Sequence, residues 1–512
     1  MLIKVYGSAV FGVEATTITI EVNVATGIGY HLVGLPDNAV RESSFRIAAA
    51  LQNNDYKFPG KKIIVNMAPA DLRKEGSAYD LSLSLGILAA SGQIKAENIS
   101  DYLIMGELSL DGSLQPIRGA LPIAIKAKED GFKGFILPKQ NAKEAAIVSG
   151  LEVYGVENIT EVINFFDTGA VLEQTIINTR EEFYKNLDHP EHDFADVKGQ
   201  ESIKRCMEIA AAGGHNIILI GPPGAGKTML AKRLPSILPP MTLREALETT
   251  KIHSVVGRIK EHVGLMSQRP FRSPHHTISD VALVGGGAYP QPGEISLSHN
   301  GVLFLDELPE FKRGVLEVMR QPLEDREVTI SRAKFTVTYP SSFMLVASMN
   351  PSPSGYFNDP DAPATSSPAE MQRYLGKISG PLLDRIDIHI EVTPVPFDKL
   401  SEERRGETSV EIRKRVTRAR QLQTERFQES DTVHYNAQMN VKQIRKYCAL
   451  DEASKSLLKT AMERLNLSAR AYDRILKVSR TIADLENSAN IQGSHISEAI
   501  QYRSLDRDGW LG

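Results

Sequence analysis

The sequence lacks the features that mark a secreted, membrane-spanning or broadly basic protein. Only two cysteines, Cys206 and Cys448, occur among its 512 residues, which argues against a disulfide scaffold and against secretion. No run reaches the roughly 18 apolar residues that span a bilayer, and the N-terminus lacks the regions of a signal peptide. The formal net charge is −4, so any site for a polyanion must be local. We therefore expect a cytoplasmic enzyme without a membrane partner.

The pattern along the chain predicts several domains, in line with a length that favours roughly two to four. Residues 1–168 mix strand-like and helix-like segments, and residues 169–192 form a polar, acid-rich connector. Residues 193–396 contain the motifs described next, whereas residues 397–512 have helical apolar spacing with many charges. The expected fold class is α/β, with a helical C-terminal part.

The most specific motif is a glycine-rich loop of the form G-x-x-x-x-G-K-[ST]. Its residues are Gly221, Pro222, Pro223, Gly224, Ala225, Gly226, Lys227 and Thr228. An apolar run at 216–220 precedes the loop and predicts a buried parallel strand, and residues 229–238 predict a helix whose N-terminus favours an anion. Backbone N–H groups of such a loop surround phosphates, Lys227 adds charge for the outer phosphates, and the Thr228 hydroxyl ligates Mg²⁺. A glycine–proline turn alone does not explain this lysine and threonine, so we expect ATP and Mg²⁺ as cofactors.

Two further strands end in polar residues that suit the same site. The run 301–307 is apolar and ends in Asp306 and Glu307. Asp306 can hold the Mg²⁺ shell, and Glu307 can orient and deprotonate the attacking water, although solvated acids at a strand end are the alternative. A third apolar strand, 343–348, leads to Asn350, which can reach the γ-phosphate or the water. By itself, Asn350 before Pro351 is more typical of a turn.

These motifs, with three further segments, carry a resemblance to a known family. The segments are 221–228, 271–276 (Phe-Arg-Ser-Pro-His-His), 301–307, 380–387 (Gly-Pro-Leu-Leu-Asp-Arg-Ile-Asp) and 468–472 (Ser-Ala-Arg-Ala-Tyr). The core resembles an AAA+ ATPase of the magnesium-chelatase type, and the whole chain is similar to the ComM/YifB family of magnesium-chelatase-like proteins. The resemblance implies a homo-oligomeric ring, expected to be a hexamer on DNA, that moves branched DNA during recombination, as in natural transformation.

The resemblance also assigns roles to two arginines. Arg385 matches the family position of the arginine finger and would serve the ATP of the neighbouring subunit, because a guanidinium can bridge two phosphate oxygens in the transition state. A local salt bridge to Asp384 or Asp387 is the alternative. Arg470 matches the second sensor of the family, and Arg474, one turn later, is the other candidate.

The first block resembles the proteolytic domain of Lon-type proteases, with signature regions at 69–80 and 106–119. A Lon-type site needs a serine nucleophile activated by a lysine. In the family register Ala78 stands at the serine position and Leu121 at the lysine position, so the catalytic pair is absent. A shifted pair of Ser77 with Lys74 or Lys126 is the alternative. We expect an inactive protease domain that supports assembly or DNA contact.

The sequence also departs from the family at a position where many relatives carry paired cysteines. Ser352 and Ser354 stand there, and because neutral hydroxyls are poor zinc ligands we expect no zinc. Four histidines suggest a different metal site: His253, His262, His275 and His276. Two adjacent histidines cannot share one helix face, and the pair 275–276 lies in a family motif, so we disfavour that interpretation.

Contact with DNA is expected from a small feature. Residues 326–339 alternate apolar and polar on both sides of a basic tip, which predicts a β-hairpin. This AAA+ clade carries such a hairpin in its central pore, where Arg332 and Lys334 would bind phosphates without reading sequence. An ordinary solvated hairpin tip is the alternative.

Three functions are compatible with these residues. The preferred one is an ATP-hydrolysing motor of the branch-migration or helicase type, acting on branched or single-stranded DNA. The second is a magnesium-chelatase-like motor subunit that remodels a protein partner, which the Lon-like first block disfavours. The third is a non-hydrolysing scaffold, which is hard to reconcile with the presence of Lys227, Asp306, Glu307 and Arg385.

Overall fold

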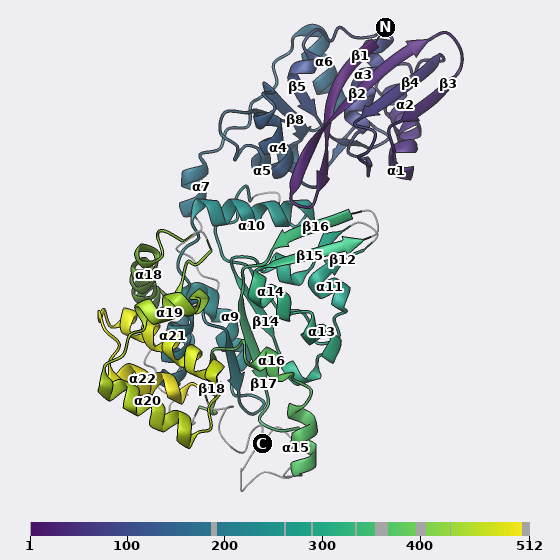
Figure 1. The fold of residues 1–512 in the computed structure, drawn as a ribbon. Coiled ribbons are helices and arrows are strands. Elements are labelled where there is room, and N and C mark those ends of the chain that lie inside the picture. The colour runs from purple at the N-terminus through teal and green to yellow at the C-terminus, as the bar shows by residue number, and fades with distance from the viewer. Residues whose placement is uncertain are drawn as a thin grey trace. The chain divides into compact units, whose positions relative to one another are not determined.

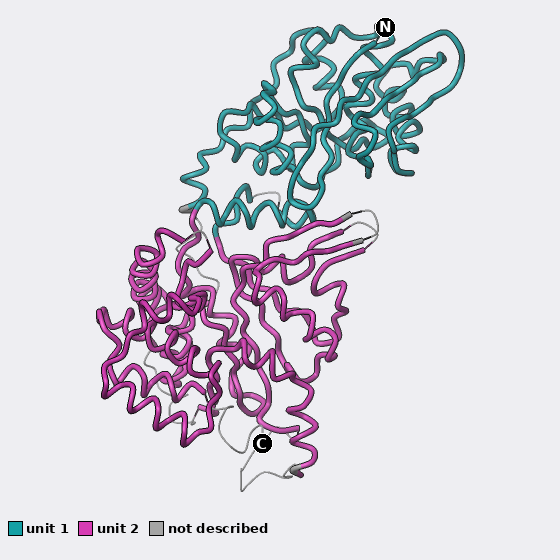
Figure 2. Tube along the Cα trace, in the orientation of Figure 1, with its two compact units in different colours: residues 1–186, 243–267 teal, residues 187–242, 268–512 magenta. Residues whose placement is uncertain are grey.

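The computed structural model describes residues 2–185, 192–260, 263–287, 290–332, 335–353, 367–395, 406–430 and 432–503. The chain divides into two compact units (Figure 2). The first comprises residues 1–186 and 243–267, and the second comprises residues 187–242 and 268–512. The segment 243–267 therefore interrupts the second unit in sequence but packs with the first. In the described part of the chain, we find no helix with the length and apolar character needed to cross a membrane.

The first unit is built on a seven-stranded mixed sheet in the order β3–β4–β2–β1–β5–β8–β9. Its strands are β1 (Leu2–Phe11), β2 (Glu14–Ala25), β3 (Gly29–Val33), β4 (Lys62–Ala68), β5 (Tyr102–Ile104), β8 (Gly134–Pro138) and β9 (Glu152–Val156). Strands β1 and β2 form a long antiparallel hairpin, whereas β1, β5, β8 and β9 run parallel. A short hairpin of β6 (Glu107–Leu108) and β7 (Leu114–Gln115) stands apart from this sheet.

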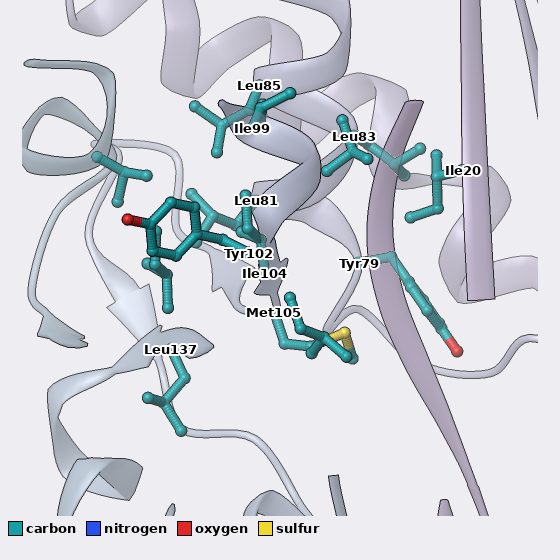
Figure 3. Close-up of a cluster of buried hydrophobic side chains, with 14 of the residues drawn as sticks. Ile20, Tyr79, Leu81, Leu83, Leu85, Ile99, Tyr102, Ile104, Met105 and Leu137 are labelled. Carbon is teal, nitrogen blue, oxygen red and sulfur yellow. The ribbon is translucent and has the colours of Figure 1, made fainter. Parts of the chain in front are cut away.

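Eight helices belong to the first unit among the described residues, and several of them pack on this sheet. They are α1 (Asn38–Arg41), α2 (Ser43–Asn53), α3 (Asp80–Ala90), α4 (Ala120–Glu129), α5 (Lys139–Ala145), α6 (Ile159–Thr168), α7 (Thr179–Lys185) and α10 (Leu243–Val255). All eleven residues of α3 are buried, because α3 lies against β1 and β2 and supplies side chains such as Leu81 and Leu83 to the core (Figure 3). A buried leucine contributes roughly 1.5–3 kcal/mol by leaving water, so this helix is central to the unit's stability.

The second unit has a five-stranded parallel sheet in the order β11–β14–β17–β10–β18. The strands are β10 (Ile217–Ile220), β11 (Phe271–Arg272), β14 (Val302–Leu305), β17 (Met344–Met349) and β18 (Ile388–Glu391). Every residue of β10, β14 and β17 is buried. Such nearly continuous apolar runs are typical of parallel strands that are covered on both faces. The AAA+ P-loop core with a parallel sheet, expected from the sequence, is confirmed.

Helices surround this sheet, and two hairpins accompany it (Figure 1). The core helices are α8 (Glu201–Gly213), α9 (Lys227–Ile237), α11 (Asp280–Val284), α12 (Glu294–Leu297), α13 (Arg313–Glu317), α14 (Arg320–Asp325), α15 (Pro368–Leu375) and α16 (Gly380–Leu383). The hairpins are β12 (Gly285–Gly286) with β13 (Gln291–Pro292), and β15 (Glu327–Arg332) with β16 (Phe335–Pro340).

The C-terminal region is helical, as expected. It consists of α18 (Ser409–Arg426), α19 (Val441–Tyr447), α20 (Glu452–Arg464), α21 (Ala469–Leu485) and α22 (Gly493–Gln501). Helices α18 and α21 pack on α8 of the core. They are also tied to each other, because Arg426 donates to Asp484 over 2.7 Å. This helical C-terminal region, called the lid below, and the parallel sheet therefore belong to one packed unit.

Candidate nucleotide-binding site

The glycine-rich loop joins β10 to α9 at the carboxyl edge of the parallel sheet. A Cβ at Gly221 would lie 2.2 Å from the Val392 carbonyl oxygen, so no side chain fits there. Gly224 and Gly226 have φ angles of +80° and +88°, a region that glycine adopts without strain. Helix α9 begins at Lys227, directly after the loop. Backbone conformation thus determines the shape of the loop, and the N-terminus of the helix that follows it suits an anion.

Lys227 lies within this loop and reaches the neighbouring strand. Its Nζ donates to the carbonyl oxygens of Gly221 (2.6 Å) and Pro222 (3.0 Å) and to Oδ1 of Asn350 (3.1 Å). Burial lowers the pKa of Lys227, while the Asp306 and Glu307 carboxylates act in the opposite direction. Lys227 and Asn350, predicted separately from two motifs, are therefore in direct contact.

The proposed Mg²⁺ residues also meet. The Thr228 hydroxyl donates to Oδ2 of Asp306 over 2.8 Å, and the Ser348 hydroxyl donates to the other oxygen, Oδ1. A hydroxyl beside a carboxylate is the type of oxygen donor set that Mg²⁺ takes in nucleotide sites. The residues present thus fit a cation held by Thr228 and Asp306, which would neutralise phosphate charge. The sequence analysis did not single out Ser348, because it stands within the apolar strand 343–348.

Glu307 follows β14 in a left-handed conformation, with φ of +54°, which is unusual for a residue other than glycine. Its N–H lies 3.1 Å from Oδ1 of Asp306 and 3.4 Å from Oγ of Ser348. The side chain is 55% exposed, and its Oε2 lies 3.4 Å from Nδ1 of His276. This contact was not predictable from a local sequence pattern, because 31 residues separate the two positions.

The histidines of the alternative metal site include the adjacent pair His275 and His276. Across the residues that the structure describes, no group of three or more His, Cys, Asp or Glu side chains is arranged to hold a metal ion. The ring centroids of His275 and His276 lie 4.1 Å apart, and Nδ1 of His275 lies 3.0 Å from the Thr277 hydroxyl. His262 and Ser354 lie outside the described residues.

Arg385 and Arg474 lie at the opposite, amino edge of the sheet. The residue before β10, Asn216, donates to the Arg385 carbonyl oxygen over 3.0 Å. A cavity of about 220 Å³ lies at this edge, and its charged lining residues are Glu324, Arg326, Arg385, Asp387, Arg474 and Lys477. Four strand residues of about 3.3 Å each separate this edge from the phosphate loop of the same chain, a distance of ~13 Å.

The ion pairs in this region differ from those suggested by the sequence. The Arg385 guanidinium pairs with Glu324 and donates to the Pro381 carbonyl oxygen over 2.5 Å, rather than pairing with Asp384 or Asp387. Asp384 pairs instead with Arg470, whose side chain is 69% exposed. Arg474 pairs with Asp387 over 2.8 Å and is 24% exposed. Of the two sensor candidates, Arg474 therefore shares the cavity with Arg385.

A buried network attaches the lid to this edge. Oδ2 of Asp387 lies 3.0 Å from Nδ1 of His215, whose Nε2 lies 2.8 Å from the Thr481 hydroxyl of α21. Burial disfavours the Asp387 carboxylate, but Arg474, His215 and Lys477 together hold its pKa well below the ordinary value. Burial and the neighbouring Arg474 lower the pKa of Lys477 to about 8. Polar contacts of Asp387 and His215 thus connect the residues that precede β18 and β10 to the lid helix α21.

The predicted β-hairpin is confirmed in the described backbone. Strands β15 and β16 pair from Glu327↔Pro340 to Arg332↔Phe335. The side chain of Arg332 and the whole of Lys334 lie outside the described residues, so the basic tip stays a prediction. At the base of the hairpin, the Tyr339 hydroxyl donates to the Pro290 carbonyl oxygen over 2.7 Å.

In the first unit, the groups of the shifted protease pair have other partners. The Ser77 hydroxyl donates to Glu107, and Lys126 pairs with Asp130 over 2.7 Å. The Lys74 side chain is fully buried, and its Nζ donates to the carbonyl oxygens of Pro69 and Leu72. At the two family positions, Ala78 is partly buried against the core of this unit, and Leu121 is fully buried. The structure therefore does not bring Ser77 to either lysine.

Comparison with known families agrees with this geometry. Two models described as magnesium chelatase subunit ChlI match residues 193–400 and 20–141, and a third, for the C-terminal part of that subunit, matches residues 406–503. A partial match is Lon-like: Lon protease 2 of Bacillus subtilis is 29% identical over 157 residues, which cover 28% of this chain and 27% of that protein. The fold, the site and these matches define an AAA+ ATPase of the magnesium-chelatase type.

Two full-length relatives narrow the class. The chain is 45% identical over 506 residues to competence protein ComM of Haemophilus influenzae, covering 98% of this chain and 97% of that protein. It is 43% identical over 506 residues to protein YifB of Escherichia coli, with the same coverage. The chain belongs to the ComM/YifB family of magnesium-chelatase-like proteins. Membership of this AAA+ family implies use of a nucleotide and Mg²⁺ and assembly into an oligomer.

Proposed function

We propose that this protein is an ATP-hydrolysing ring motor, with a hexamer as the expected assembly, that translocates branched or single-stranded DNA during recombination or natural transformation. The observation that carries the proposal is the position of Arg385. It lies at the amino edge of the parallel sheet, and the four residues of β10, about 3.3 Å each, separate this edge from the phosphate loop of its own chain. A second subunit that brings its loop to this edge would complete the site.

The roles within one chain follow from the contacts described above. Lys227 binds the outer phosphates, and Thr228 and Asp306 hold Mg²⁺. Glu307 takes the proton of the attacking water, because it is the exposed carboxylate beside this pair. Asn350, bonded to Lys227, orients the γ-phosphate or the water.

The cavity at the amino edge contributes residues to the nucleotide site of the neighbouring subunit, which we call the trans site. Arg385 stabilises the charge that develops on the neighbour's phosphate in the transition state. Arg470 matches the second sensor by sequence, whereas Arg474 is favoured by its position in the cavity beside Arg385. Because Arg474 also pairs with Asp387 at the start of β18, lid movement and the trans site would be coupled.

Action on DNA is supported by two observations. The hairpin of β15 and β16 has Arg332 and Lys334 at its tip, where they would contact phosphates without sequence preference. A relative that is similar over 97% of its own length is named for competence. With a net charge of −4, a local basic tip suits a motor that must release DNA as it moves.

The alternative is a chelatase-like motor that remodels a protein partner. It is favoured by the three family models, all of which describe magnesium chelatase subunit ChlI. The deciding experiment measures phosphate release by the full-length protein with no DNA, single-stranded DNA, duplex DNA and a four-way junction. Stimulation by the junction or the single strand supports the DNA motor. An ATPase that responds to none of the three DNAs would refute it in favour of the alternative.

A further inference from the structure

The two outer strands of the seven-stranded sheet in the first unit differ in how their edges are covered. Strand β9 is covered by the segment that follows α6, because Gln174 forms a bridge with Tyr154. In the same segment, the Thr175 N–H donates to the Val153 carbonyl oxygen over 2.8 Å. At the other end of the sheet β3 is the last strand, and no further strand of the described chain pairs with it. Its residues, Gly29–Val33, contain neither proline nor charge, the features that protect an edge strand from pairing with another chain.

The uncovered edge has a set of exposed apolar side chains, which we call the edge patch. It comprises Ile28 before β3, Val33 at the end of β3, Leu35 in the turn that follows and Phe45 in α2. Ile28 is 91% exposed and Phe45 is 77% exposed, and no residue from 22 to 36 is an acid, a lysine or an arginine. A single exposed apolar side chain is ordinary, but four of them at an unprotected sheet edge indicate a contact surface for protein.

A second apolar surface lies at the opposite edge, on the segment that covers β9. In this segment, residues 171–176, which we call the connector strip, Leu172 is buried, whereas Val171 is 93% exposed and Ile176 is 81% exposed. Six strand spacings of about 4.8 Å separate β3 from β9, so the two surfaces lie roughly 29 Å apart along the sheet. The edge patch and the connector strip therefore cannot contact each other within one chain.

The charges beside the two surfaces have opposite signs. Lys62 of β4 is in register with the first residue of β3, and a Cβ at Gly27 would lie 3.4 Å from its Cβ and 3.7 Å from its Cδ. The Lys62 side chain thus runs along the start of the edge patch. The connector strip instead contains Glu173. Opposite charges favour contact between the two surfaces over contact of either surface with its own copy.

We infer that the edge patch of one subunit packs on the connector strip of the next subunit. A closed ring requires a heterologous contact of this kind, in which two different surfaces on opposite sides of each subunit meet. The chain belongs to an oligomeric family, and the inference rests on the proposed ring. A stable interface takes about 800 Å² from each partner, more than these few side chains supply, so the contact adds to one made by the second units. The first unit is thereby an assembly element.

Disulfide crosslinking of the full-length protein tests this contact, because the native Cys206 and Cys448 are both buried. Val33→Cys and Ile176→Cys in one chain should give a ladder of covalent oligomers under mild oxidation. Each substitution alone should give only monomers on a denaturing gel, and a mixture of the two single variants should give dimers and nothing larger. The matched control replaces Val33→Cys by Leu110→Cys, because Leu110 is about as exposed but lies in the turn between β6 and β7. The control should give no ladder.

The stability of the oligomer provides a second measurement. Val33→Glu faces Glu173 in the inferred contact and should raise the protein concentration at which half of the oligomer dissociates by about tenfold or more, the factor lost with one buried aliphatic side chain. Leu110→Glu should leave this concentration unchanged.

The outcomes separate this contact from the ring itself. A wild type that is monomeric in light scattering refutes the ring and the contact together. An oligomeric wild type whose Val33–Ile176 cysteine pair gives no ladder retains the ring and overturns the contact, and the edge patch then serves a different protein. Crosslinking of Val33→Cys to its own copy overturns the contact in favour of a two-fold pairing of β3 edges. A ladder of equal strength from the Leu110 control overturns it as well.

Discussion

Each unit of the molecule contains a buried lysine whose ammonium group donates to carbonyl oxygens of its own loop. In the first unit, Lys74 bonds to Pro69 and Leu72. In the second, Lys227 bonds to Gly221 and Pro222. Burial lowers the pKa of both lysines. Neither burial nor a shifted pKa therefore distinguishes a structural lysine from a functional one.

The difference lies in what else surrounds them. Lys227 also contacts Asn350, and two carboxylates, Asp306 and Glu307, act on its pKa. Around Lys74 only Asp71 acts in this way, and the nearby Ser77 is bonded to Glu107. The lysine of the first unit thus holds a loop together, whereas the lysine of the second belongs to a set of groups from three strands that converge on one edge. The first unit has its own buried hydrophobic core without this convergence.

Among substitutions that test this comparison, replacement of Lys227 should have the largest effect on nucleotide binding. Lys227→Ala should weaken ATP binding by roughly 10- to 100-fold, because a charge-assisted hydrogen bond to phosphate contributes about 1.5–3 kcal/mol. Glu307→Gln should instead bind ATP normally and hydrolyse it ~10²–10⁴ times more slowly. Equilibrium binding of a fluorescent ATP analogue and single-turnover hydrolysis separate the two. Equal affinity of wild type and Lys227→Ala, or rapid turnover by Glu307→Gln, would contradict these roles.

The next largest effect concerns the site between subunits. Arg385→Ala should retain ATP binding and lose hydrolysis by about 10³-fold or more, since its charge acts on the neighbour's transition state. Mixing Arg385→Ala with Lys227→Ala subunits should restore part of the activity, because some interfaces then combine an intact loop with an intact finger. If mixed oligomers form but stay as inactive as each parent, the trans assignment of Arg385 is wrong or the ring requires every interface.

How much of this site the sequence predicts depends on the distance that each contact spans. The loop 221–228 and the acidic pair 306–307 are recognisable because each is a local pattern on a buried strand. The strand order and the partners brought in by the fold were not predictable: Ser348 beside Asp306, His276 beside Glu307 and Glu324 beside Arg385. The assignment of residues 243–267 to the first unit was also not predictable, because a helical pattern does not indicate which part of the protein the helix packs against.

The hairpin gives a smaller effect that leaves the nucleotide site untouched. The double variant Arg332→Ala with Lys334→Ala should keep the basal ATPase rate and lose its stimulation by DNA. Removing two phosphate contacts should also make junction binding less dependent on salt, because fewer counterions are released. Binding isotherms at several salt concentrations, measured with the ATPase rates, check both parts. If DNA stimulates the ATPase of the double variant as much as that of the wild type, the hairpin tip is a solvated turn without a role in DNA binding.

The smallest effect on ATPase activity is expected in the first unit, where it sharpens the comparison of the two lysines. Lys74→Met removes the donor of two buried carbonyl oxygens and should destabilise the unit by about 1–3 kcal/mol, seen as a lower thermal unfolding temperature. Its ATPase rate below that temperature should match the wild type, because Lys74 belongs to the unit without the phosphate loop. Ser77→Ala should change neither ATPase nor the absence of peptide hydrolysis expected of the wild type. Cleavage of an unfolded protein substrate by the wild type that both Ser77→Ala and Lys74→Met remove would show that Ser77 leaves Glu107 and forms the shifted pair after all, and the first unit would then be a second enzyme.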